Sequence, residues 1–81
     1  MTISNQLVVR SINDKTMIIN LKNGQVTVID EIGELFWQSI VTDQKDEVFK
    51  KIISEYDVSL EVLEEDYKEF INKMRELEIV W

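Results

Sequence analysis

The side chains best suited to acid–base chemistry are four carboxylates that stand close together in the chain. Glu64, Glu65, Asp66 and Glu69 belong to one charge run. A run of this kind on a long helical segment is most often a solvated face. The sequence has no histidine and no cysteine, which removes imidazole bases, thiolate nucleophiles and the usual zinc ligands. We therefore expect a protein that is not an enzyme, with no catalytic residue, no metal site and no cofactor.

The charge balance bears on the choice of partners. Nine basic and sixteen acidic residues give a formal net charge of −7, which repels phosphate backbones and anionic lipid surfaces. We expect no nucleic-acid and no membrane partner, whereas a neutral or basic peptide is compatible. The 81 residues predict a single domain, 1–81, with a modest core. Residues 1–6 have neither a basic start nor a long apolar run, which predicts a cytoplasmic protein.

The backbone of one segment remains as a candidate for recognition. Residues 25–30 follow an Asn23-Gly24 turn and form the last strand-like stretch before helical periodicity begins. No later segment reads as a strand that could pair with it. The segment contains no lysine or proline of the kind that protects an exposed edge. We expect an open sheet edge here, which can accept another chain as an added strand.

The periodicity on either side of this segment predicts the elements that position it. β-Branched residues at 7–13 and 16–21 predict two further strands. Asp30 is suited to cap a first helix, Ser59 to cap a third, and the third helix is expected from about Leu60 to Leu77. The sequence therefore predicts an α+β fold, a winged helix-turn-helix with a three-stranded antiparallel sheet followed by three helices.

Two further features concern how these elements pack. Gly33 stands inside the expected first helix, where glycine costs about 1 kcal/mol relative to alanine. A close approach of this helix to the sheet would explain that cost. Residues 79–81 are apolar, and we expect this tail to pack back on the domain.

An Asn-Gly pair in a two-residue hairpin fixes a register for the last two strands. Leu21 would oppose Val26, and Ile19 would oppose Val28. These four residues share one apolar face, which we expect to lie on the core. Ile18 and Ile29 then fall on the more polar face, either as an ordinary exposed pair or as a grip for a ligand.

The third helix offers an apolar stripe beside the expected edge. An added peptide would bury alternate side chains against it. Phe70 and Met74 are the stronger candidates for core, whereas Tyr67 and Ile71, at the margin of the stripe, are the better candidates for a groove. Asp66 would bind a basic or amide group of the ligand, or else face solvent.

Two other functions stay open. The first is an acidic winged-helix protein-interaction or transcription-regulatory domain that uses the third helix as its interface. The second is a nucleic-acid binder, which the winged-helix order alone would suggest. Residues 60–81 contain seven acidic and three basic residues, so a recognition helix here would repel phosphates.

Several motifs together resemble the PqqD-like proteins, also called RiPP recognition elements. They span about Val9 to Val80. In chain order they are Asn23-Gly24, Val26-x-Val28-x-Asp30, Gly33-x-x-x-Trp37, Tyr56-Asp57-Val58 and Val62-x-x-x-Asp66-Tyr67-x-x-Phe70-Ile71-x-x-Met74.

The resemblance implies a peptide chaperone of natural-product biosynthesis that binds the leader peptide of a ribosomally synthesised precursor. A chain of this length resembles the freestanding type, which serves a separate enzyme such as a lasso-peptide leader peptidase or a radical SAM maturase. The open edge would also permit a homodimer. Family members often carry glycine where this chain has Glu78, which leaves the path of the tail open. The implied peptide contacts are Val26, Thr27, Val28, Ile29, Asp66, Tyr67, Phe70, Ile71 and Met74.

Overall fold

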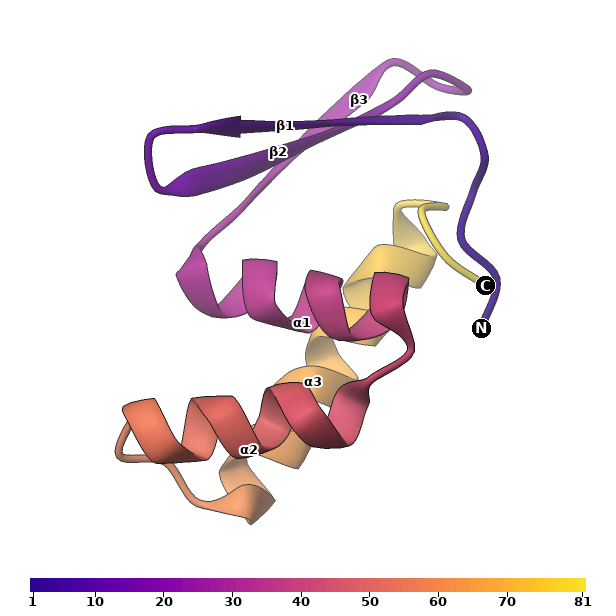
Figure 1. Cartoon of the computed structure of the whole chain (residues 1–81). Helices are drawn as coiled ribbons and strands as arrows, with labels where there is room; N and C mark the ends of the chain where they lie inside the picture. Colours follow the sequence, from indigo (N-terminus) through magenta and orange to yellow (C-terminus); the bar gives the residue numbers. More distant parts are fainter.

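A computed structural model describes residues 1–81 and places the sheet as one layer above the helices (Figure 1). None of the three helices combines the length and apolar character that crossing a bilayer requires. The order of strands and helices confirms the predicted α+β winged helix-turn-helix arrangement. Its elements are β1 (Leu7–Ile12), β2 (Lys15–Asn20), β3 (Gln25–Ile29), α1 (Glu31–Thr42), α2 (Lys45–Glu55) and α3 (Leu60–Glu76).

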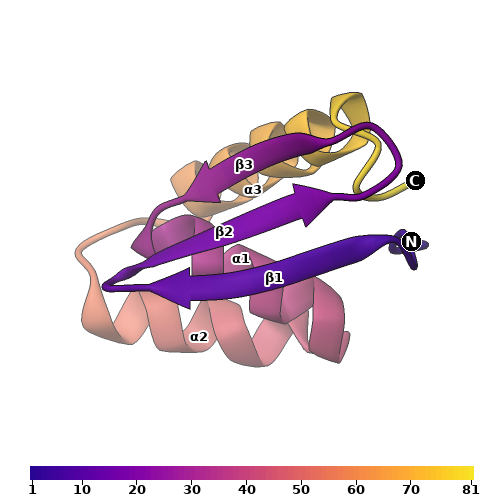
Figure 2. The same cartoon turned by 90° about the horizontal axis from the view of Figure 1, so that it is seen from above.

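The sheet is an antiparallel meander in the order β1-β2-β3, so β3 has a strand neighbour on one side only. Seen from above, α3 runs alongside β3, on the side away from β2 (Figure 2). Asp30 begins α1 as predicted, because its side chain accepts a hydrogen bond from the Gly33 N–H at 2.8 Å. Ser59 caps α3 in the same way. The edge of β3 and the helix α3 therefore lie next to each other.

The predicted register of the β2–β3 hairpin is wrong by two residues. Asn20 pairs with Gln25, which leaves four residues in the turn, and Ile19 opposes Val26. The Gly24 N–H donates to the Asn20 carbonyl at 2.8 Å, with Gly24 at φ +73°. The buried side chain of Asn20 also donates to the Leu77 carbonyl at the end of α3. Asn20 therefore forms the last β2–β3 pair before the turn, and its side chain satisfies a carbonyl at the end of α3.

The face assigned to the core is also wrong. Ile18 and Ile29 are 0% and 6% exposed, whereas Val26 and Val28 are 55% and 59% exposed. The grouping of residues into two faces survives, because a shift of two residues preserves side-chain alternation. Both faces of β2 and β3 carry aliphatic residues, so hydrophobicity did not distinguish them. The face of the sheet that lies on the helices also carries the buried polar residues Asn20 and Thr16. The Thr16 hydroxyl donates a hydrogen bond to the Glu34 carboxylate.

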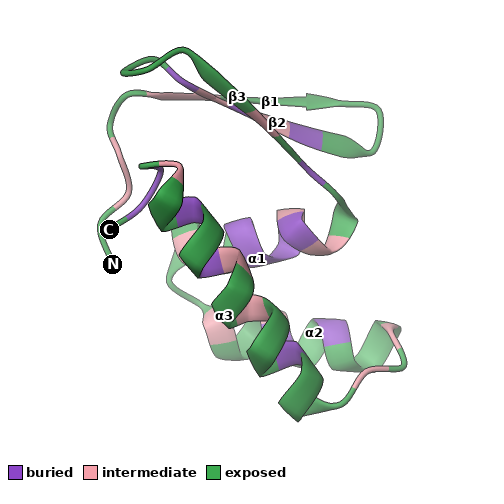
Figure 3. Ribbon diagram, turned by 180° about the vertical axis from the view of Figure 1, so that it is seen from behind, coloured by how far each residue is buried: buried purple, intermediate pink, exposed green.

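The core consists of two clusters. The first joins the sheet to α1, the end of α3 and the tail, and contains Ile18, Ile29, Trp37, Met74, Ile79 and Val80. The second joins the three helices and contains Leu35, Phe36, Phe49, Ile52 and Leu63. Phe70 packs against both clusters. The buried positions of α3 recur along one side of the helix with half-buried positions beside them, and the other side is exposed (Figure 3).

Ile79 and Val80 pack back on the domain, as predicted for the tail, whereas the side chain of Trp81 is 62% exposed and the prediction is wrong for it. Glu78 lies at φ +59°, its N–H donates to the Arg75 carbonyl, and the Ile79 N–H donates to the Met74 carbonyl. This pair of bonds is a Schellman motif, whose left-handed position normally favours glycine. Val80 then bridges to Ile3. The glutamate at position 78 therefore adopts the conformation of a glycine, and the path of the tail is kept.

Candidate functional site

The direction of the backbone groups of β3 follows from the hydrogen bonds of its neighbour. The Leu21 N–H donates to the Gln6 carbonyl, on the β1 side. Backbone groups alternate in direction along a strand, so those of Asn20 point the other way, toward β3. The residues whose backbone groups point toward each other between β2 and β3 are therefore the pairs Ile18–Thr27 and Thr16–Ile29. At the turn end of the hairpin, Gln25 pairs with Asn20 and its N–H donates to the Asn23 side chain. The N–H and C=O groups of Val26 and Val28 point outward from the open edge.

A groove lies between this edge and α3. Its first segment has a volume of about 180 Å³ and lies directly beside the strand. Thr27 and Ile29 border it from β3, whereas Phe70 and Met74 border it from α3. Phe70 and Met74 give this segment an apolar surface on the α3 side, next to the ammonium-bearing side chain of Lys73. We name it the anchor segment.

The groove continues past the start of α1 into a second segment of about 450 Å³. The two segments share Asp30, Gly33, Phe70 and Lys73. A Cβ atom added at Gly33 would lie 3.1 Å from the Ile29 Cβ and 3.5 Å from the Phe70 ring. The glycine thus permits the close approach of α1 to β3 that its place inside a helix suggested. We name this part of the groove the acidic segment.

Carboxylates dominate the acidic segment. Asp30, Asp66 and Glu69 line it, against the single ammonium group of Lys73. None of them takes part in an ion pair, because the one ion pair of the chain joins Lys45 to Glu64 at 3.1 Å.

Charge is also unevenly distributed along the whole chain. Three basic residues and one acidic residue precede Asp30, whereas six basic and fifteen acidic residues lie from Asp30 onward.

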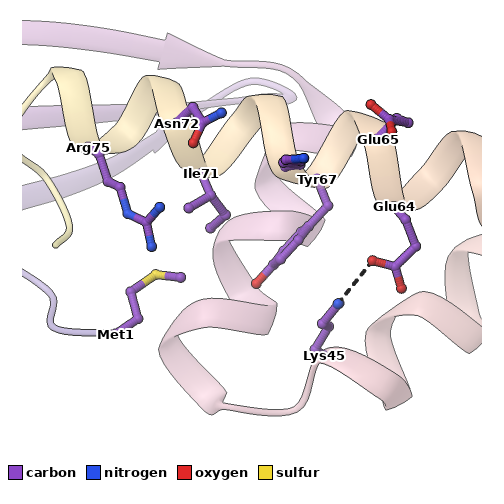
Figure 4. A pocket seen from close by; sticks show the side chains of 9 residues that line it. Met1, Lys45, Glu64, Glu65, Tyr67, Ile71, Asn72 and Arg75 are labelled. Atoms are coloured by element: carbon purple, nitrogen blue, oxygen red, sulfur yellow. Dashed lines mark hydrogen bonds and ion pairs between the residues drawn. The ribbon is translucent and has the colours of Figure 1, made fainter.

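The opposite flank of α3 carries a different pocket, of about 410 Å³ (Figure 4). Tyr67 and Ile71 line it together with Met1 and Arg75. Lys45 occupies one end, with its ammonium group 5.0 Å from the Phe49 ring centroid and 5.1 Å from that of Tyr67. No strand edge borders this pocket, so an extended peptide has no backbone groups to pair with there.

The structure brings together most of the predicted site residues, with two exceptions. Thr27, Val28, Ile29, Phe70 and Met74 line the anchor segment, and Asp66 lines the acidic segment. Val26 lies on the same open edge. Tyr67 and Ile71, which the sequence favoured, lie on the opposite flank of α3.

Sequence reasoning missed several lining residues of the groove. Lys73 and Glu69 share a helix flank with Asp66, at spacings of seven and three residues, which the helical period could have shown. Asp30 was recognised as a helix cap and Gly33 as a point of close approach to the sheet, but neither was recognised as a lining residue of a groove. Their place in the groove depends on how α1 packs against β3, which no local pattern reports.

One ionisable group has a shifted pKa, and it lies outside the groove. The Tyr56 hydroxyl donates to a Glu31 carboxylate oxygen at 2.7 Å. This hydrogen bond, followed by partial desolvation and the negative charges of Glu31 and Glu55, raises the pKa of Tyr56 above its ordinary value. The contact links the end of α2 to the start of α1.

Comparison with known proteins gives two matches. No curated protein matches the sequence. Among solved structures, TbiB1 in complex with the TbiA(beta) leader peptide is similar, with a TM-score of 0.87 and 25% identity over 99% of this chain and 94% of that chain. Residues 15–80 match the family described as "Coenzyme PQQ synthesis protein D (PqqD)". This match spans most of the chain and confirms the PqqD-like assignment made from the sequence motifs, so the chain belongs to the PqqD family.

Proposed function

We propose that the protein binds the leader peptide of a ribosomally synthesised precursor, as an additional strand on β3. The observation that carries the proposal is the outward direction of the Val26 and Val28 backbone groups beside the groove against α3. Two N–H groups and two C=O groups at alternate residues are what a paired strand requires. The similarity to TbiB1, a structure solved with a leader peptide, supports the same conclusion.

The protein acts as a binding partner in this proposal and does not itself modify the peptide. A bound leader fixes the position of the segment that follows it, which raises the effective concentration of that segment at a second protein. The proposed second protein is a separate maturation enzyme, either a lasso-peptide leader peptidase or a radical SAM enzyme. The similarity to TbiB1, a protein solved with its leader peptide, supports a separate precursor peptide as the ligand.

Amide chemical shifts test the site directly. Protein labelled with ¹⁵N is titrated with synthetic leader peptides of ribosomally synthesised precursors. We expect the largest shifts at Val26, Val28 and Gly33, because these amides lie at the edge and in the groove. Shifts confined to Tyr67, Ile71 and their neighbours would place binding on the opposite flank and contradict the proposal.

Two proline substitutions provide a matched test of the open edge. Val28→Pro removes an outward N–H and spares the β2–β3 hydrogen bonds, which an edge strand tolerates. We expect a folded protein that binds the leader on the order of tenfold more weakly, because one backbone hydrogen bond is worth about 1 kcal/mol. Thr27→Pro removes an inward donor and should disrupt the sheet. If Val28→Pro is folded and binds as tightly as the native protein, the peptide does not pair with this edge.

The same edge could also accept β3 of a second copy, which is the homodimer that an open edge permits. Peptide binding and this dimer would then exclude each other, because both use the backbone groups of Val26 and Val28. Sedimentation at several protein concentrations, with and without leader, tests this competition. A dimer that survives saturation with leader would require another interface.

A further inference from the structure

The alternation of side chains along an added strand determines which peptide residues enter the groove. Directly opposed residues of paired strands send their side chains to the same face. The side chain of Ile29 faces the helix layer, where it is buried, and Thr27 shares that face of β3. A peptide residue opposite Thr27 therefore enters the anchor segment, and one opposite Ile29, two positions along, also faces the helices. The residue between them lies over the exposed face of the sheet, next to Val28.

The two groove-facing positions meet different chemistry. The position opposite Thr27 faces Phe70 and Met74 in a space of about 180 Å³. The position opposite Ile29 lies over Gly33, which has no side chain, and so leads into the acidic segment. There Asp66 and Glu69 are exposed, accept no hydrogen bond from the chain and form no ion pair.

We propose that this protein selects leaders carrying an aliphatic residue opposite Thr27 and a lysine or arginine at the next groove-facing position, two residues along. The inference rests on the proposed strand addition and names the peptide chemistry that the same groove prefers. Asp66 and Glu69 act as specificity residues, since they contact the cation of the ligand. Lys73 and Asp30 line both segments, so their opposite charges offset each other at the anchor position, whereas Asp66 and Glu69 add negative charge only to the acidic segment.

A randomised display library tests this preference independently of any natural leader sequence. Peptides of about twelve residues are selected on the native protein, on a groove variant with Asp66→Lys and Glu69→Lys, and on a control variant with Glu61→Lys and Glu65→Lys. Both variants change the net charge of α3 equally, but Glu61 and Glu65 do not line the groove. The native and control proteins should enrich a basic residue two positions from an aliphatic one. The groove variant should lose this enrichment or replace it with an acidic residue.

A synthetic peptide from the native selection gives the quantitative test. Replacement of its basic residue by norleucine keeps the alkyl chain and removes the charge. We expect the affinity for the native protein to fall about three- to tenfold, and the affinity for the groove variant to stay equal or rise. The same loss on both proteins, or enrichment of the same basic residue by all three, would overturn the specificity proposal.

Failure of the specificity proposal is distinguishable from failure of strand addition. Each selected peptide is also measured against Val28→Pro. Peptides that depend on Val28 but show no charge preference refute only the assignment of Asp66 and Glu69. Peptides that bind Val28→Pro undiminished refute the proposed site itself, and a library that yields no Val28-dependent peptide refutes both.

Discussion

The two flanks of α3 present similar residue types but offer different binding surfaces. On one flank Phe70 and Met74 face a groove that is bordered by the free backbone groups of β3. On the other flank Tyr67 and Ile71 face a pocket whose end holds the Lys45 ammonium group against two aromatic rings. Only the first flank combines apolar side chains with unpaired backbone donors and acceptors. The apolar stripe of a helix therefore does not locate a peptide site by itself, and the neighbouring element decides.

The largest expected effect comes from truncating one aromatic residue on each flank. Phe70 and Tyr67 are both half-buried and lie 5.5 and 5.3 Å, centroid to centroid, from the Phe36 ring. Phe70→Ala should lower the free energy of unfolding by about 2–3 kcal/mol, less than for a fully buried phenylalanine. Tyr67→Ala should lower the free energy of unfolding by a similar amount. Chemical denaturation measures both, with the leucine variants as milder versions that keep the chain folded.

Peptide binding separates these two variants. Phe70→Leu should weaken leader binding about tenfold or more, since Phe70 lines both segments of the groove. Tyr67→Leu should leave binding within about twofold, because Tyr67 lies on the other flank. Calorimetric titration of both provides the comparison. Equal losses of leader affinity in the two variants would mean that both flanks of α3 affect binding, which would contradict the assignment of the site to one flank.

A methyl group at Gly33 tests the groove flank alone. Gly33→Ala gains about 1 kcal/mol in helix propensity, but the new Cβ would lie 3.1 Å from the Ile29 Cβ. Crowding of this kind typically costs about 1–3 kcal/mol, so we expect a net loss of about 1 kcal/mol and weaker leader binding. Thermal unfolding and a binding titration measure the two effects. A more stable variant with unchanged affinity would show that α1 can move away from β3 without consequence.

A substitution at the end of α3 should stabilise the protein without touching either flank. Glu78→Gly removes the side chain from a residue at φ +59°, where glycine is favoured. We expect a gain of about 0.4–1 kcal/mol in the free energy of unfolding, reduced slightly by loss of the contact from the Asn23 amide at 3.5 Å. Leader affinity should not change. Glu78→Ala, which keeps the positive φ but lacks the contact, is the control and should not stabilise.

The smallest effect is expected from the ion pair on the opposite flank. Lys45 and Glu64 form a half-exposed pair 3.1 Å apart, and exposed pairs contribute about 0.2–1 kcal/mol. Lys45→Met should therefore change stability by less than about 1 kcal/mol and leave leader binding intact. The effect should shrink in high salt, which denaturation at two ionic strengths would reveal. A loss of leader binding would assign a role to the opposite flank.

Local signals in the sequence were sufficient for the order and type of the elements. Asp30 and Ser59 are capping residues in the sequence and in the structure, because a cap depends only on residues within one turn of the helix. The close approach to the sheet expected at Gly33 is confirmed, because a Cβ atom added there would lie 3.1 Å from the Ile29 Cβ. The predicted packing of the tail is confirmed for Ile79 and Val80, which are buried, but not for the exposed side chain of Trp81.

The errors concern choices that depend on long-range packing. The hairpin register was placed by the Asn23-Gly24 pair alone, whereas the buried Asn20 binds a carbonyl 57 residues away. The preference for Tyr67 and Ile71 over Phe70 followed from the same limitation. The assignment of Ile71 to the margin of the stripe was wrong, because Ile71 is only 6% exposed, whereas Tyr67 is half-buried. Which margin of the stripe faces β3 depends on how α3 crosses the sheet. Neither the register of the β2–β3 hairpin nor the direction in which α3 crosses the sheet can be read from the residues of a single segment.

The separation of charge between the two layers has a kinetic consequence. The sheet-forming residues before Asp30 are weakly cationic, whereas the helical part carries fifteen of the sixteen acidic residues. Such a molecule has an electric dipole that orients a charged ligand before contact. A cationic peptide would approach the acidic segment first and pair with the strand afterwards. Added salt should then lower the association rate constant, while the dissociation rate constant stays almost unchanged.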